Sequence, residues 1–303
     1  MPSSAIVFSY DSQSDVEYYI KNFEKMGLES MIICTEGDMD LSRVENLIQG
    51  KSVELVFNRE RLGKSAAYNN AMKLASSDIV FLISGDVRFD PHEINIMEES
   101  MKDDEIIIPR VVPFETGSRA GRIASFMWNL RDTCLDSDDW GYPKSGGEFQ
   151  ALPSKCLVII PNVINDDEYI CLNAHSNGMR VVYRRDLVVR NWVPETFREL
   201  LIQRVRINYG HLEMKKYFEK SASLSLNFIR NIRKSFRIMK KHFLRYPEDI
   251  RYILPAFALE LTSIVYAYFD LKRSRNHLLW RMVSTSHDPG NSPDLNSSFF
   301  SRP

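Results

Sequence analysis

Cysteine is scarce in this sequence of 303 residues, and the four cysteines are far apart. They are Cys34, Cys134, Cys156 and Cys171. Because no CxxC pair is present, we expect neither a structural zinc site nor a disulfide framework. The N-terminus lacks a basic segment followed by a long apolar stretch, so no signal peptide is visible. These absences favour a reducing, cytoplasmic setting.

Charge of one sign is also missing, since the formal net charge is -1. Domains that coat nucleic acid usually carry a large basic excess, so a nucleic-acid partner is not expected. Glycine and proline are few, at 13 residues each, while 44% of residues are hydrophobic. The composition is that of a folded protein, long enough for one large α/β domain and a smaller appendage, or for two modest domains.

The first hundred residues alternate short β-rich runs with helical patterns. The predicted strands are Ala5–Tyr10, Met31–Cys34, Val53–Phe57, Ile79–Ile83 and Glu105–Ile108. The predicted helices are Asp15–Met26, Leu41–Ile48, Gly63–Ala75 and His92–Met101. This order predicts a mainly parallel sheet with helices on both faces, and Ile79–Ile83, apolar throughout, as a central strand. Binding sites in such sheets lie at the carboxyl ends of the strands.

The rest of the chain is predicted in less detail. Residues 109–161 contain several glycines and are read as an irregular segment. Two short strands are expected at Val181–Tyr183 and Leu187–Val189, and helix after Pro194. We divide the chain into a domain at 1–212, a helical extension at 213–283 and a disordered tail at 284–303, which is rich in Ser, Asn and Pro.

Ser84-Gly85-Asp86-Val87 directly follows the predicted central strand. A carboxylate at the end of a strand can hold Mg²⁺ or Mn²⁺, and the metal in turn neutralises a diphosphate. The alternative, a turn former or helix N-cap, suits Asp90 before Pro91 better than Asp86.

Asn165-Asp166-Asp167-Glu168 is a second candidate. Adjacent acids raise one another's pKa, which suits one of them to general-base catalysis near neutral pH. A solvated acidic N-cap for a helix at Tyr169–Asn177 is the alternative, and on these residues alone it is favoured about two to one.

Gln203-Arg204-Val205-Arg206-Ile207 is the third candidate. Arginines at i and i+2 cannot share one helix face, so one is expected to point inward, where it can contact a phosphate, while the other is solvated. The alternative is an ordinary surface arginine on an amphipathic helix.

The order of these segments resembles that of family 2 glycosyltransferases. Asn58–Ala71 resembles the segment that precedes the metal site in that family, and Gly146-Gly147-Glu148-Phe149 resembles its acceptor-side glycine loop. Asp166-Asp167, followed by Gly178 and Arg180–Tyr183, is similar to the family's acidic pair and its continuation. Residues 203–207 look like a degraded Gln-x-x-Arg-Trp motif. The resemblance covers roughly residues 4–211.

The resemblance implies a GT-A fold and an inverting transfer from a UDP- or GDP-sugar, with Mg²⁺ or Mn²⁺ as cofactor. By position, Asp86 corresponds to the metal-binding last Asp of the DxD motif, and Asp167, beside Asp166, to the general base. The implied contacts to the nucleotide sugar are Tyr10, Asp11, Glu36, Lys64, Asn69, Ser84, Gly85 and Asp86. Those on the acceptor side are Gly147 and Glu148; those to phosphate are Gln203, Arg204 and Arg206; and His211 is a further candidate metal ligand.

Two departures from the family pattern stand out. Ser84 replaces the first Asp of DxD, and Ile207 replaces the Trp of the processive members. A catalytically inactive nucleotide-sugar scaffold is therefore one alternative, for which Ser84 is the main argument. A sugar nucleotidyltransferase is another, but the turn after the first strand, residues 9–13, lacks the glycine and the basic residue that it would need.

The C-terminal third interleaves basic and apolar residues, and Tyr252–Phe269 is almost wholly apolar apart from Pro255 and Glu260. This pattern is typical of an interfacial helix attracted to anionic lipid. It predicts a protein peripheral on the cytoplasmic face of a membrane, with a lipid-linked or glycan acceptor. A helical hairpin that covers the domain or forms a homodimer is an equally weighted alternative.

Overall fold

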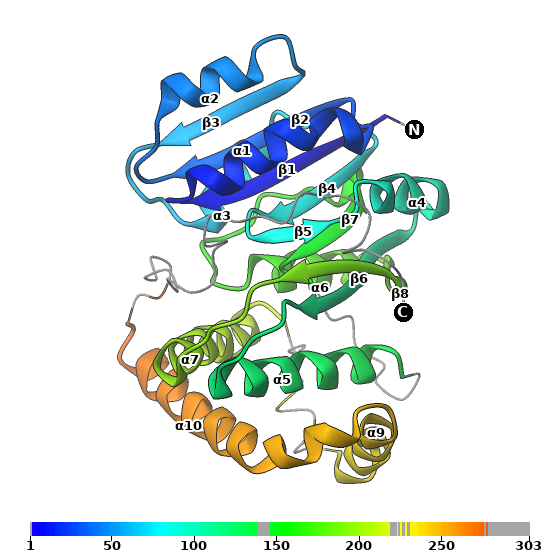
Figure 1. Cartoon of the computed structure of the whole chain (residues 1–303), viewed down its shortest axis with the longest axis vertical. Helices are drawn as coiled ribbons and strands as arrows, with labels where there is room; N and C mark the ends of the chain where they lie inside the picture. The colour runs from blue at the N-terminus through cyan, green and yellow to red at the C-terminus, as the bar shows by residue number, and fades with distance from the viewer. Residues whose placement is uncertain are drawn as a thin grey trace.

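The computed structural model describes residues 2–137, 146–218, 223, 225, 228, 231–275 and 277. Its strands form one eight-stranded sheet in the order β3-β2-β1-β4-β7-β6-β8-β5 (Figure 1). The strands are β1 Ser3–Tyr10, β2 Ser30–Glu36, β3 Val53–Asn58, β4 Ile79–Ser84, β5 Val87–Phe89, β6 Glu105–Pro113, β7 Phe149–Pro153 and β8 Arg180–Asn191. The α-helices are α1 Gln13–Asn22, α2 Leu41–Ile48, α3 Lys64–Ala71, α4 His92–Ser100, α5 Arg119–Leu135, α6 Asp166–Ser176, α7 Phe197–Glu213, α9 Ile232–Arg245 and α10 Ile253–Lys272. Short 3₁₀ helices are η1 Phe23–Met26, η2 Ser154–Cys156, η3 Met214–Lys216 and η4 Pro247–Tyr252.

The N-terminal half is the predicted parallel sheet with helices on both faces. β1 pairs in parallel with β2 and β4, and β2 pairs with β3. Alternate residues of the strands face opposite sides, so Val7 packs in one apolar cluster with α1 and α4, while Ile6 packs in a second with α3 and α6. The prediction of a mainly parallel α/β fold, with β4 buried at its centre, is confirmed.

Residues 109–161 are more regular than predicted. β6 continues to Pro113, α5 spans 17 residues, and β7 runs antiparallel between β4 and β6. The glycines had suggested irregular backbone, but Gly121 lies in the first turn of α5. A Cβ there would lie 2.4 Å from the Thr116 hydroxyl, so glycine permits close packing rather than breaking the helix. The two short strands expected after residue 180 are also wrong in detail. They form the single strand β8, with a register shift opposite Pro109 and Arg110.

The C-terminal helices lie at the end of the molecule opposite α2 and β3 (Figure 1). α10 packs against α7 and α5, and α9 packs against α5. The predicted boundary at residue 212 falls at the C-terminal end of α7. The predicted disordered tail, 284–303, and the last residues of the extension, 278–283, lie outside the described residues.

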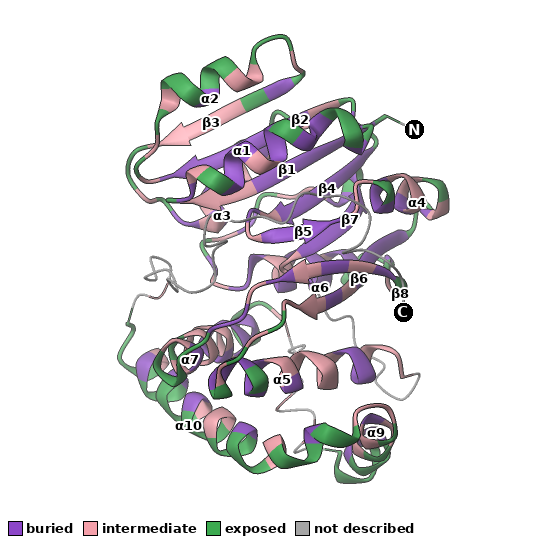
Figure 2. Ribbon diagram, in the orientation of Figure 1, coloured by how far each residue is buried: buried purple, intermediate pink, exposed green. Residues whose placement is uncertain are grey.

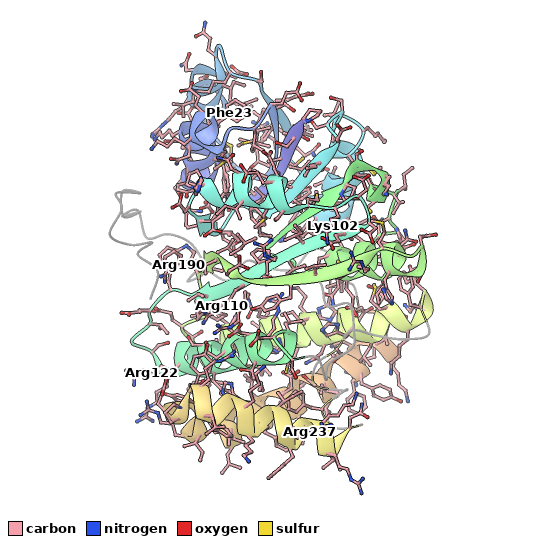
Figure 3. The ribbon with its side chains drawn as sticks, turned by 90° about the vertical axis from the view of Figure 1, so that its right-hand side faces the viewer. Phe23, Lys102, Arg110, Arg122, Arg190 and Arg237 are labelled. Atoms are coloured by element: carbon pink, nitrogen blue, oxygen red, sulfur yellow. The ribbon has the colours of Figure 1, made fainter. Side chains whose placement is uncertain are left out.

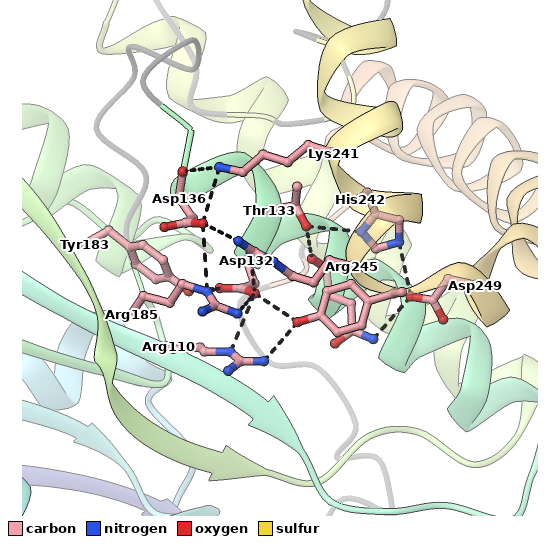
Figure 4. A network of polar contacts seen from close by, with 12 residues as sticks. Arg110, Asp132, Thr133, Asp136, Tyr183, Arg185, Lys241, His242, Arg245 and Asp249 are labelled. Atoms are coloured by element: carbon pink, nitrogen blue, oxygen red, sulfur yellow. Dashed lines mark hydrogen bonds and ion pairs between the residues drawn. The ribbon is translucent and has the colours of Figure 1, made fainter. Parts of the chain in front are cut away.

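A buried polar network ties α9 to the sheet (Figure 4). Its centre is Asp132 of α5, which accepts a hydrogen bond of 2.7 Å from the Tyr183 hydroxyl. Arg185 of β8 lies 3.2 Å from the same carboxylate, and Arg245 of α9 lies 3.5 Å from it. Asp132 is only 3% exposed, so these partners supply the charge and hydrogen bonds that its burial requires.

Candidate functional site

A cavity of about 740 Å³ lies where β1, β2 and β4 end, and α6, α7 and α10 contribute to its walls. Most of the residues singled out from the sequence line it. They are Tyr10, Glu36, Lys64, Ser84, Gly85, Asp86, Gly147, Glu148, Asp166, Asp167, Gln203, Arg204, Arg206 and His211. The crossover topology of the sheet explains this, because parallel strands bring their carboxyl ends to one edge.

The loop after β4 is held tightly against its neighbours. The Gly85 N–H donates to the Phe8 carbonyl at 2.7 Å, and a Cβ on Gly85 would lie 3.0 Å from that oxygen. Ser84 Oγ donates to the Gly147 carbonyl at 2.8 Å. The Ser84 hydroxyl therefore fixes the glycine loop, while the half-buried Asp86 lines the cavity.

Glu36 organises the loop that follows β3. Its carboxylate accepts the backbone N–H groups of Leu62 at 3.1 Å and Gly63 at 3.3 Å. This loop carries Arg61, whose guanidinium lies 3.9 Å from the centre of the Tyr10 ring. Glu36 thus places a cation–aromatic pair at the cavity wall.

Two of the predicted residues do not line the cavity. Asp11 is exposed in a left-handed turn, with φ of 51°, and accepts the backbone N–H of Asp38 at 3.3 Å. Asn69 bridges to the loop before α6, because its amide donates to the Ile160 carbonyl and accepts the Ile160 N–H. Within the described residues, both side chains stabilise backbone around the site.

The acidic pair at the start of α6 is divided between two environments. Asp166 is buried and its carboxylate lies 3.4 Å from Lys64 Nζ, which also donates to the Gly147 carbonyl at 3.2 Å. Burial raises the pKa of Asp166, and Asp167 adds to this, although Lys64 opposes it. Burial acts to lower the pKa of Lys64, but Asp166 and Asp167 outweigh it, so the net pKa is raised and the lysine stays charged.

Asp167 is half-buried and lines the cavity. Its carboxylate lies close against the glycine loop, because a Cβ built on Gly147 would lie 3.0 Å from Asp167 Oδ2. Such contacts are tighter than side chains normally make, so glycine at this position leaves room for the carboxylate. Asp167 is thus confined by Gly147 on one side and open to the cavity on the other.

The two arginines of α7 point to different partners. Arg204 makes two hydrogen bonds of 2.8 Å to Glu260 of α10, so it is paired within the chain. Burial acts to raise the pKa of Glu260, but Arg204 and the other donors outweigh it and lower that pKa to about 2. Burial lowers the pKa of Arg206 to about 10, although Asp166 and Asp167 oppose this. Arg206 therefore remains a cation facing the carboxylates of the cavity.

His211 joins α7 to α6. Its Nδ1 lies 2.6 Å from Glu168 Oε2 and 3.4 Å from the Asn165 amide nitrogen. The preceding residue, Gly210, leaves room for Asn165, whose side chain would overlap a Cβ built there. One ring nitrogen of His211 is therefore already engaged in packing the two helices together.

The donor set allows a divalent cation only with help from a substrate. No group of three or more His, Cys, Asp or Glu side chains able to hold a metal occurs among the described residues. Asp86 supplies one carboxylate, and Mg²⁺ is commonly held by one or two carboxylates together with substrate phosphates and water. The residues present fit a metal that arrives with, or is completed by, a diphosphate.

Sequence reasoning missed two arginines and one apolar group that line the cavity. Arg61 lies in the segment that carries the family resemblance but was given no role, and Arg131, which lies 3.1 Å from Glu148, belongs to the unpredicted helix α5. The apolar group comes from α5, α7 and α10. It comprises Met127, Trp128, Leu200, Phe257, Leu261 and Ile264. The three helices that supply it are far apart in sequence, so no local pattern shows that their side chains meet.

Residues 38–152 match the family model described as glycosyl transferase family 2. Among solved structures, the chain is similar to the mannosyltransferase PcManGT from Pyrobaculum calidifontis in complex with GDP-Man and Mn²⁺, at a TM-score of 0.58 and 15% identity. That match covers 90% of this chain and 88% of the other. A second match, to glucosyl-3-phosphoglycerate synthase of Mycobacterium tuberculosis, has a TM-score of 0.48 and 15% identity and covers 68% of this chain and 78% of the other. No curated protein matches the chain.

Proposed function

We propose that this chain, a family 2 glycosyl transferase with the GT-A fold, moves a sugar from a UDP- or GDP-sugar to a hydroxyl or phosphate acceptor with inversion. The observation that carries the proposal is the pairing within one cavity of Asp167, half-buried beside Gly147, with Asp86 at the end of β4. The similar mannosyltransferase structure contains a GDP-sugar and Mn²⁺, which supports this class of donor.

In this proposal the donor lies across the ends of β1, β2 and β4. The Tyr10 ring and the Arg61 guanidinium suit contact with a nucleobase or ribose. Glu36 holds the loop that carries Arg61 in place by accepting the Leu62 N–H. Asp86 would hold Mg²⁺ or Mn²⁺ beside the diphosphate, where the metal supplies positive charge. Arg206 adds a half-buried cation of the chain itself, which lines the same cavity and would attract phosphate.

Asp167 would act as the general base. It would take the proton of an acceptor hydroxyl as the oxygen attacks the anomeric carbon, while the bond from that carbon to the diphosphate breaks. Asp166 is less suited to this step, because its carboxylate is held by Lys64. The acceptor side would be formed by Gly147 and Glu148, and the apolar group from α5 and α10 favours a lipid-linked acceptor over a free glycan.

A nucleotide-sugar scaffold without catalysis is the second candidate. Ser84 favours it, because the hydroxyl that replaces a DxD carboxylate donates to the Gly147 carbonyl instead of adding a negative ligand for a metal. The two candidates share the donor site and differ only in turnover.

Replacing the proposed base separates them. We expect Asp167→Asn to abolish transfer while UDP- or GDP-sugar with Mn²⁺ still raises the Tm as in the unmodified protein, because the amide keeps the shape but cannot accept the proton. Asp103→Asn, in an exposed turn, is the matched control and should keep full activity. Near-normal turnover of Asp167→Asn would refute the assignment of the base. A donor-dependent rise in Tm without transfer by the unmodified protein, across a panel of acceptors, would favour the scaffold.

A further inference from the structure

The apolar residues of α10 face outward. Its large exposed side chains recur every three or four residues, which places them on one stripe of the helix. The stripe consists of Leu254, Phe257, Leu261, Val265 and Phe269, of which Leu254 is 80% exposed, and Tyr266 and Tyr268 are exposed as well. The opposite, inner face carries small or polar residues, namely Ala256, Glu260, Ser263, Ala267 and Asp270. A surface helix of a water-soluble domain normally shows the reverse arrangement.

Polar contacts fix this orientation. Glu260 is bound by Arg204 at 2.8 Å and by the Asn208 amide at 3.1 Å, and the same amide donates to Ser263 at 2.8 Å. Rotating α10 to bury its apolar stripe would break these bonds and leave buried charge without a partner, which is costly. The stripe is therefore a stable feature of the folded chain rather than a poorly packed core face.

α9 and η4 extend the same kind of surface. Ile232, Phe236 and Leu244 of α9 and Ile250 of η4 are each at least 63% exposed. α9 has no acidic residue, and its exposed basic residues are Arg233, Lys234, Arg237 and Lys240, whereas Lys241 and Arg245 pair with Asp136. The exposed faces of α9 and α10 lie at the end of the molecule away from the sheet (Figure 2). Arg237 of α9 accordingly lies at the end opposite Phe23 (Figure 3). We call the exposed side chains of Ile232–Lys272 the α9–α10 face.

We propose that the α9–α10 face docks on the surface of an anionic lipid bilayer, with α10 lying along the interface. An apolar stripe beside basic residues is the form of an interfacial helix, in which apolar burial and attraction to anionic headgroups add. Pro247–Lys272 is long and apolar enough to cross a membrane, but its inner face is bonded to α7, which favours lying along the surface. A second copy of the chain fits less well, because it would bring two α9 helices of the same charge together.

The face also continues into the cavity. Phe257 and Leu261 belong to the exposed stripe and line the cavity that holds Asp86 and Asp167. An acceptor with an apolar tail could therefore leave that tail in the bilayer while its polar end reaches the carboxylates. This step rests on the proposed transferase function, whereas docking itself does not.

Vesicle flotation of the full chain tests the docking. We expect it to float with phosphatidylcholine vesicles containing about 30% phosphatidylglycerol, and less with phosphatidylcholine alone or at high salt. The variant Leu254→Gln, Val265→Gln, Phe269→Gln removes exposed stripe residues that do not line the cavity, and its partition coefficient should fall about tenfold or more. The matched control, Leu74→Gln with Ile159→Gln, changes exposed apolar residues outside the face and should float normally.

A second variant, Arg233→Gln with Lys240→Gln, should lose the preference for anionic vesicles even if the first variant folds poorly. Failure of the unmodified chain to float with either vesicle would overturn the proposal, as would flotation that neither variant weakens. A different result would assign the face to a second copy of the chain. In that case light scattering would show that the unmodified chain is a dimer, the stripe variant would be a monomer, and the unmodified chain would not float with vesicles. The Tm shift with nucleotide sugar is read separately, so loss of donor binding with intact flotation would refute only the transferase function.

Discussion

Gly147→Ala tests whether Asp167 must lie where the structure places it. A Cβ on residue 147 would lie 3.0 Å from Asp167 Oδ2 and 3.1 Å from its Cγ. The backbone of residue 147 cannot easily retreat, because its carbonyl accepts hydrogen bonds from Ser84 Oγ at 2.8 Å and Lys64 Nζ at 3.2 Å. The carboxylate of Asp167 must therefore move by a few tenths of an ångström or more.

If Asp167 is the base, as proposed, displacing its carboxylate lowers the rate of transfer but not the affinity for the donor. A misplacement of about 1 Å can reduce catalysis by about 100-fold, so we expect the kcat of Gly147→Ala to fall by roughly 10- to 100-fold. Steady-state kinetics at saturating donor measure this, and the Tm shift produced by the donor should stay unchanged. Gly117→Ala is the matched control, because a Cβ there meets no atom within 4 Å.

The combination of two variants makes the test specific. If Gly147→Ala acts only through Asp167, it should not lower the trace turnover of Asp167→Asn that a large excess of enzyme reveals, because the effects of interacting residues are not additive. Unchanged kcat in Gly147→Ala, or full additivity with Asp167→Asn, would refute the reasoning.

Two further predictions concern the helices behind the cavity. Glu260→Gln should lower the free energy of unfolding at pH 7 by on the order of 3 kcal/mol, because Arg204 holds the pKa of Glu260 at about 2, below its ordinary value of 4.5. This stabilisation is present above the unfolded-state pKa and is lost as the pH falls toward 2. The difference in the free energy of unfolding between Glu260→Gln and the unmodified protein, measured in urea, should therefore become smaller below about pH 4.5. A difference that does not change with pH would contradict the prediction. Asp132→Ala should lower the free energy of unfolding by about 3–5 kcal/mol, because it leaves Arg110, whose side chain is 19% exposed, without the carboxylate that lies 3.6 Å from it. Asp104→Ala, which removes an exposed partner of Arg180, should change urea unfolding little, and equal losses for the two would show that burial does not set the cost.

The sequence was most informative where one local pattern decides the structure. The β4 strand is predictable because residues 79–83 are all apolar, and the parallel order follows from helices between the strands. β7 was missed because its five residues pair with β4 and β6, which are distant in sequence and supply the antiparallel context. α5 was missed because Gly121 reads as a helix breaker until Thr116 is seen to occupy the space beside it.

The candidate site divides in the same way. Asp86 and Asp166-Asp167 stand out in the sequence because adjacent acids and a strand-end carboxylate are local features. The different environments of the two acids depend on Lys64 and Gly147, which lie on other elements. The apolar part of the cavity depends on the orientation of α10, which Arg204 and Asn208 set from α7. Contacts of this kind cannot be read from spacing alone.

Ser84 and the cations of the cavity together set the balance of charge around Asp86. An acidic residue at position 84 would add negative charge near Asp86, and serine removes that charge while its hydroxyl holds the glycine loop. In the proposed transferase, the diphosphate of a donor would then meet one carboxylate of the strand-end loop, together with the half-buried cation of Arg206. Fewer acidic ligands weaken the hold on a free metal, yet they also reduce repulsion of the diphosphate. In the proposed transferase, metal and nucleotide sugar should therefore bind together more tightly than either does alone.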